Sequence, residues 1–131
     1  MATVETIKDP LGNIFTDTKF DTRTRGVKAE ADGYKHGELL HYNDTTGEYE
    51  RAIVADDSGD TETTADAVVY GGIVANATDG VIIVTGGVRA SLLYGYDVDA
   101  SAVVPFSGLA DAEQFRVVGE LADKKIIVGD L

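Results

Sequence analysis

The strongest pattern of apolar and polar positions in the chain is a pair of β-branched runs separated by an Asp-Gly dipeptide. The runs cover residues 67–77 and 81–85, and the dipeptide is Asp79-Gly80. Asp-Gly between such runs indicates a β-hairpin, because both residues tolerate the positive φ angles of a tight turn. A glycine pair near each end of the region is typical of bends or bulges. The pattern predicts a small, tightly curved β-structure with this hairpin at its centre.

Other apolar segments predict further strands around the hairpin. The turn between the first two is residues 43–47, whose side chains hydrogen-bond their own backbone or accept positive φ angles. Polar, acid-rich stretches at 55–66 and 97–101 are expected to be connections. The strands expected beyond the hairpin are residues 38–42, 48–54, 88–94 and 126–128.

The segment from 107 to 122 is predicted to contain a short helix. Asp111 can cap its first turn, and Gln114 follows three residues later, as in a capping box. Gly119 predicts that the helix ends close to it. The alternative is that Phe115–Val118 forms a strand beside the last strand; the helix is favoured because the residues before this segment are poor strand formers. The residues expected on the apolar helical face are Ala112, Phe115, Val118 and Ala122.

Residues 1–34 are predicted to be an extended N-terminal arm, and residues 35–131 a compact β-rich domain. The arm has scattered apolar residues but no stripe with helical spacing. It is either a flexible terminus or an arm that orders on a partner, for example by adding a strand to the partner's sheet. The second interpretation is favoured. The candidate partner-binding residues are Val4, Ile7, Ile14, Phe15, Lys19, Arg23, Arg25 and Lys28.

Composition and charge narrow the classes of function. The chain has 131 residues, 44% of them hydrophobic, and no cysteine, so one domain stabilised by packing or by oligomerisation is expected. Residues 1–35 contain six basic and six acidic residues, so the entire net charge of −12 lies in the rest. This charge argues against nucleic acid and anionic membranes as partners. No membrane span or secretion signal is expected. The predicted fold class is mainly β (α+β): a small β-barrel or sandwich-like domain with one short C-terminal helix.

Motifs that carry chemistry are weak or missing. His36 and His41 lack a metalloprotease spacing and are expected to be structural. The alternating acidic residues in 56–62 resemble half of a calcium loop, but the glycine is misplaced and position twelve is Ala67, so a solvated loop is expected. No phosphate-binding glycine motif or nucleophile elbow is present. We therefore expect no enzyme activity, no metal and no cofactor.

Taken in order, the segments resemble the phage lambda type of head decoration protein. The resemblance covers residues 37–128 and rests on the order of segments. Two features depart from the family pattern: Tyr70 and an extra glycine interrupt an Ala-Val-Gly-Ile segment, and the chain has no tryptophan. The segments that carry the resemblance are Gly37–Tyr49, Ala67–Val74, Val81–Val84, Gly87–Arg89, Leu92-Leu93, Asp111–Gly119 and Ile126–Val128.

This resemblance implies a function on the outside of a virus particle. The family implies a homotrimer that is made in the host cytoplasm and binds the major capsid protein at three-fold and quasi-three-fold points of the expanded shell. It stabilises the head against internal DNA pressure, and the arm would pair with capsid strands. Two other classes stay open: a small β-barrel adaptor that binds a soluble partner, and a small hydrolase or carbohydrate-active enzyme with a pocket of convergent polar groups.

Overall fold

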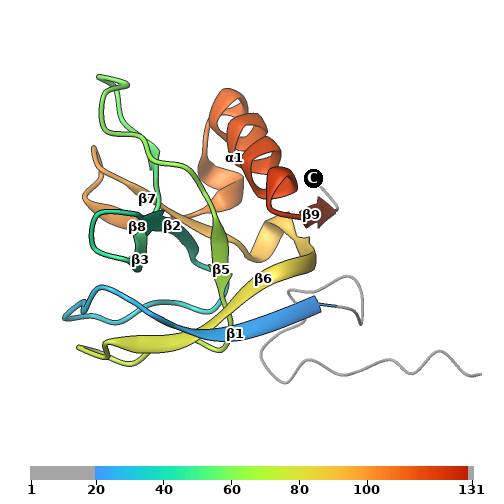
Figure 1. Ribbon diagram of the computed structural model, residues 1–131. Helices are drawn as coiled ribbons and strands as arrows, with labels where there is room; N and C mark the ends of the chain where they lie inside the picture. The colour runs from blue at the N-terminus through green and yellow to red at the C-terminus, as the bar shows by residue number, and fades with distance from the viewer. Residues whose placement is uncertain (1–19, 130–131) are drawn as a thin grey trace, which may run out of the picture.

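The computed structural model describes residues 20–129, which form a mainly β structure with one α-helix packed over the sheets (Figure 1). The two sheets pack in a sandwich-like arrangement and do not close into a barrel, so the predicted fold class is confirmed. The elements are β1 (Phe20–Gly26), β2 (Leu39–Asn43), β3 (Glu48–Arg51), β4 (Ile53–Ala55), β5 (Ala67–Val69), β6 (Asp79–Arg89), β7 (Tyr94–Asp97), β8 (Ala102–Pro105), α1 (Asp111–Asp123) and β9 (Ile126–Gly129), with the 3-10 helices η1 (Ala90–Leu92) and η2 (Phe106–Gly108).

The larger sheet is organised around β6, a strand of 11 residues. Its strand order is β1-β6-β5-β2-β3, and β9 runs parallel to the C-terminal end of β6. The smaller sheet has the order β4-β7-β8. The backbone N–H of Tyr94 in β7 donates to the Gly37 carbonyl at 3.0 Å, and Glu38, just before β2, forms a β-bridge with Tyr94, so the two sheets are joined by hydrogen bonding as well as by packing.

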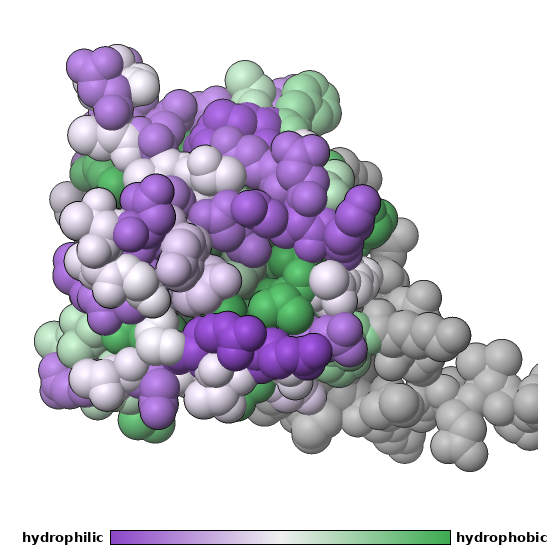
Figure 2. Space-filling view, in the orientation of Figure 1, coloured by the Kyte–Doolittle hydropathy of each residue, from purple (hydrophilic) through white to green (hydrophobic). Residues whose placement is uncertain are grey.

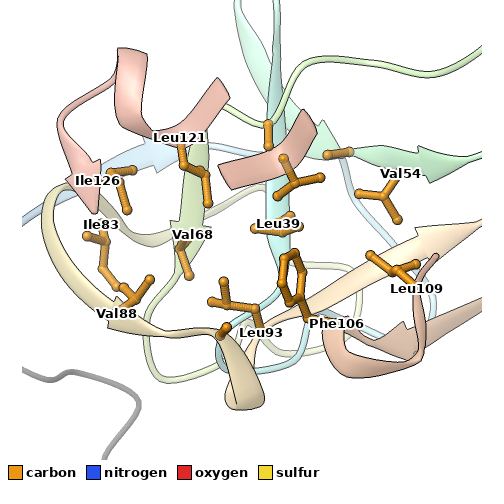
Figure 3. Packing of buried hydrophobic residues seen from close by; sticks show 14 residues of the cluster. Leu39, Val54, Val68, Ile83, Val88, Leu93, Phe106, Leu109, Leu121 and Ile126 are labelled. Carbon is orange, nitrogen blue, oxygen red and sulfur yellow. The ribbon is translucent and has the colours of Figure 1, made fainter. Parts of the chain in front are cut away.

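Apolar residues from both sheets and from α1 form the main core. Leu121 of α1 and Ile126 of β9 lie over Val68 of β5 and Ile83 of β6 (Figure 3). All four side chains are fully buried, and Phe106 fills the space toward the smaller sheet. Burying one such side chain contributes roughly 1.5–3 kcal/mol, so this contact fixes where the helix sits on the sheet.

The predicted hairpin exists, but its turn does not fall at Asp79-Gly80. These two residues are the first two of β6 and pair with Gly26 and Arg25 of β1. The chain instead reverses within residues 70–78, where Gly71, Gly72 and Asn76 adopt positive φ angles of 81°, 77° and 63°. A Cβ atom on Gly80 would lie 2.4 Å from Cδ1 of Ile73, so the glycine is required for close packing rather than for a turn.

Residues 20–34 belong to the compact domain, although the sequence analysis assigned them to the arm. All of β1 pairs with β6, from Phe20 opposite Gly86 to Gly26 opposite Asp79. Val27 is fully buried after this strand. The physical reason is that β6 lies inside the sheet: β5 pairs with one of its edges, and β1 pairs with the other edge and satisfies the backbone groups there. Residues 1–19 of the predicted arm lie outside the described residues.

The helix is confirmed, but its start, end and buried face differ from the prediction. It begins at Asp111 without a side-chain cap, and Gly119 lies inside it. The side chain of Gln114 donates to the Leu109 carbonyl at 3.0 Å instead of closing a capping box. Val117 and Leu121 are the buried residues, whereas Phe115 is 68% exposed. The strand alternative for residues 115–118 is therefore excluded, and β9 confirms the predicted last strand.

Candidate functional site

The first candidate site is the exposed surface of β1. Arg23 and Arg25 are both solvent-exposed, and their guanidinium groups donate to the carbonyls of the preceding residues, at 2.8 and 3.1 Å. Within residues 20–129 neither side chain forms an ion pair. Figure 2 shows a strongly hydrophilic strip in the position that β1 occupies in Figure 1, beside a hydrophobic patch. The strand therefore presents two exposed cationic groups on an acidic protein.

β1 is also an edge strand. It pairs with β6 on one side, and its other side meets the rest of the sheet only at one end, where Val27 bridges Tyr49 of β3. The N–H of Lys28 donates to the Tyr49 carbonyl at 2.8 Å at the same point. An edge strand presents backbone donors and acceptors on which an extended segment of another chain can pair.

The structure places three of the predicted site residues. Arg23 and Arg25 lie on β1, and Lys28 is exposed just beyond it, on the rim of a separate pocket. The two arginines thus share one strand, whereas Lys28 lines a pocket that neither arginine lines. The remaining candidates lie outside the described residues: Val4, Ile7, Ile14, Phe15 and Lys19.

The second candidate site is built around Arg51, which the sequence analysis did not single out. Its guanidinium donates from Nε to Glu38 at 2.6 Å and from Nη2 to the Gly33 carbonyl at 2.6 Å and to Asp32 at 3.2 Å. Glu30 lies 3.4 Å from Nη1. The Arg51 side chain is only 13% exposed, and these contacts fix its position between the two sheets.

Aromatic rings complete the surroundings of Arg51. The centre of its guanidinium lies 5.2 Å from the ring centroid of Tyr34 and 6.0 Å from that of Tyr96. Both distances fall in the range of cation–π attraction. A pocket of about 310 Å³ opens beside this arrangement at the junction of the two sheets. Its lining residues are Lys28, Glu30, Glu50, Arg51, Ile53 and Tyr96.

Burial perturbs the ionisable groups of this cluster. Glu38 has no exposed surface, and burial raises the pKa of its carboxyl, although the Lys35 N–H and Arg51 favour the ionised form. Burial also raises the pKa of Tyr34, and the charge of Glu30 adds to this effect. The charge of Glu38 raises the pKa of Arg51 against the opposing effect of burial, so this side chain stays protonated.

The two histidines serve structural contacts, as predicted. Nδ1 of His36 accepts a hydrogen bond from the N–H of Gly71 at 2.7 Å. Nδ1 of His41 lies 3.0 Å from the Thr64 carbonyl and 3.2 Å from Asp66. In the acidic loop, Asp56 accepts from the Ser58 N–H at 2.9 Å, an ordinary turn contact. Within residues 20–129 no group of three His, Cys, Asp or Glu side chains is arranged to hold a metal ion.

One signal in the sequence pointed toward the Arg51 cluster. Glu38 stands between Gly37 and the apolar pair Leu39-Leu40, so a strand that buries its neighbours on both sides also buries the carboxylate. The partner could not be found in this way, because Arg51 is thirteen residues away and reaches Glu38 only through the pairing of β2 with β3.

Comparisons with known proteins add no family to this description. No protein-family model matches the chain, and no curated protein matches its sequence. In the part of the chain that the structure describes, no helix has the length and apolar character that a membrane crossing requires.

Proposed function

We propose that this protein is a viral head decoration protein that binds the outer surface of the expanded capsid as a homotrimer and stabilises it. The observation that carries the proposal is the surface of β1, an edge strand with two exposed arginines that form no ion pair within residues 20–129, on a chain of net charge −12. Such a strand suits a docking surface for an acidic partner with an extended segment.

A small acidic protein can stabilise a capsid shell by binding to its outer surface. A protein that binds only the expanded shell stabilises that shell by mass action. A trimer engages three capsid positions at once, so weak single contacts sum to tight attachment. The acidic body faces outward, away from packaged DNA, and the arginines of β1 meet acidic groups of the major capsid protein. The protein acts as a structural component of the virion and catalyses no reaction.

The test is a binding experiment with shells assembled from the major capsid protein of the same virus, in unexpanded and expanded forms. Electron microscopy should show added density at three-fold positions of the expanded form alone. The double variant Arg23→Glu, Arg25→Glu should weaken binding at least tenfold at low salt and less at high salt, because salt screens the attraction that the substitution removes.

The matched control is Arg89→Glu, which reverses an exposed arginine at the far end of β6. It should bind expanded shells as the parent does. Equal binding of the double variant and the parent would remove β1 from the interface. Absence of binding by the parent itself would leave the adaptor class as the better account.

The proposed trimer has its own measurement. Light scattering at micromolar concentration should give three times the chain mass of 13.8 kDa. A monomer in solution that decorates shells would mean that the capsid assembles the trimer, whereas a monomer that does not decorate would contradict the proposal.

A further inference from the structure

The pocket beside Arg51 has the dimensions of a site for a small group. It lies where β3, β4 and β7 meet the segment that follows β1, and its volume of about 310 Å³ is at the lower end of the range for small-molecule sites. Ile53 and Tyr96 supply apolar wall, and the remaining lining residues are charged. The pocket can therefore hold an apolar stem and recognise a charged head.

Arg51 forms a fixed side of this pocket, but its charge is already matched. Glu38 binds its Nε atom at 2.6 Å, and Gly33 and Asp32 accept from Nη2. An incoming anion would have to displace these contacts, and it would meet the carboxylates that make them. Arg51 consequently shapes the pocket and does not attract an anion into it.

The charges that remain favour a cation. Arg51 carries one positive charge but contacts three carboxylates, those of Glu38, Glu30 and Asp32. With Glu50, which also lines the pocket, four carboxylates are set against two cations, Arg51 and Lys28. Among residues 20–129 the carboxylate of Glu50 accepts a hydrogen bond from the side-chain amide of Asn43 at 3.2 Å, and a carboxylate can accept further hydrogen bonds. The net charge of −12 adds a long-range attraction for cations.

We infer that this pocket binds an organic cation, a guanidinium or alkylammonium head on a short apolar stem. The head lies against Glu30 and Glu50, where the carboxylates accept its N–H groups. The stem packs on Ile53 and Tyr96. Lys28 opposes the cation from the rim. The inference does not depend on the proposed capsid function, because it rests on the pocket alone.

The experiment uses two probes that separate the sources of such a cation. Agmatine represents a free metabolite, and N-acetylarginine amide represents an arginine side chain of a partner protein. Binding is measured by titration calorimetry and by chemical-shift changes in the labelled full chain. Saturable binding of either probe, with shifts at Ile53 and Tyr96, supports the inference, and the preferred probe identifies the source. Acetate, the anionic control, should not bind.

Variants with opposite expected signs make the test specific. Glu50→Gln and Tyr96→Leu should each weaken binding at least threefold, and Lys28→Met should strengthen it at least twofold. Tyr42→Leu is the matched control, because Tyr42 is an exposed tyrosine of β2 outside the pocket; its affinity should equal that of the parent. Glu50→Gln covers the case in which Tyr96→Leu does not fold. Absence of saturable binding, or binding that Glu50→Gln and Lys28→Met leave unchanged, would overturn the inference.

Discussion

At the scale of single residues, the most consequential side chain is the buried carboxylate of Glu38. It lies between the Lys35 N–H at 3.0 Å and the Arg51 guanidinium at 2.6 Å, and so joins the segment after β1 to β3 of the larger sheet. A buried charge of this kind contributes little net stability when paired, but removing one partner leaves the other uncompensated. Glu38 and Arg51 are therefore expected to matter as a pair.

The free energy of unfolding should depend on pH through the titration of Glu38. Because burial raises the pKa of Glu38 above its ordinary value of 4.5, the folded state binds this proton more tightly than the unfolded state. The stabilisation from protonation is fully present below pH 4.5 and is lost as the pH rises through the higher folded-state pKa. Urea unfolding of the parent should therefore show a free energy of unfolding that falls across this window.

The variant Glu38→Gln should lack the part of this fall in the free energy of unfolding that comes from the titration of Glu38. Glu48→Gln is the control: it removes an equal charge from β3, at a residue that is only half-buried. Its pH profile should parallel that of the parent. Parallel profiles for the parent and Glu38→Gln would mean that Glu38 titrates at its ordinary pKa in the folded protein.

Two glycines should respond in opposite directions to alanine substitution. Gly80→Ala places a methyl group 2.4 Å from Ile73 and should destabilise the protein by about 1–3 kcal/mol through overpacking. Gly119→Ala lies inside α1 with open space around it and should stabilise by about 0.5–1 kcal/mol through helix propensity. Denaturant titration of each variant measures the change in the free energy of unfolding. A neutral Gly80→Ala would mean that Ile73 moves aside at little cost.

At the scale of elements, α1 shows how packing selects one face of a helix. The sequence analysis predicted an inward face with Phe115 and Val118, whereas the structure buries Val117 and Leu121. Arg116, next to Val117, donates to the Val54 carbonyl at 2.9 Å and pairs with Glu120 at 2.9 Å, which fastens the helix to the smaller sheet. A face with Phe115 inward would break these contacts.

Truncation of the helix side chains should distinguish the two faces. Leu121→Ala should destabilise by about 2–5 kcal/mol, since it leaves a cavity in the main core. Phe115→Ala, at an exposed position, should change stability by less than about 0.5 kcal/mol. Thermal unfolding of both variants is the measurement, and equal losses would indicate that Phe115 is covered in solution, as a self-associating trimer could cause.

At the scale of the whole molecule, charge is the dominant property. The net charge of −12 produces self-repulsion that opposes the compact state. Added salt screens this repulsion, because the Debye length falls from about 30 Å at 0.01 M to about 3 Å at 1 M. Tm should therefore rise with sodium chloride by several degrees over this range. A Tm that falls with salt would show that attractive pairs, such as those of Arg116 and Arg51, outweigh the repulsion.

The sequence by itself determined the fold class and the position of most elements. Strands 39–43, 48–51 and 126–129 and the helix fell close to their predicted places, because alternation and propensity act between near neighbours. The sequence also predicted the polar connections. The capsid role stays a prediction, and of its candidate residues only Arg23, Arg25 and Lys28 lie within residues 20–129.

Tertiary structure decided what depends on residues far apart in the chain. The local sequence Asp79-Gly80 predicts a turn, yet both residues lie in a strand. Their pairing with Gly26 and Arg25 of β1 satisfies the hydrogen-bonding groups of their backbone. β1 pairs with the edge of β6 that faces away from β5, and the buried pair of Glu38 and Arg51 follows from the pairing of β2 with β3. Local patterns contain no information on these partners, since contact between distant segments is selected by shared burial and by backbone hydrogen bonding.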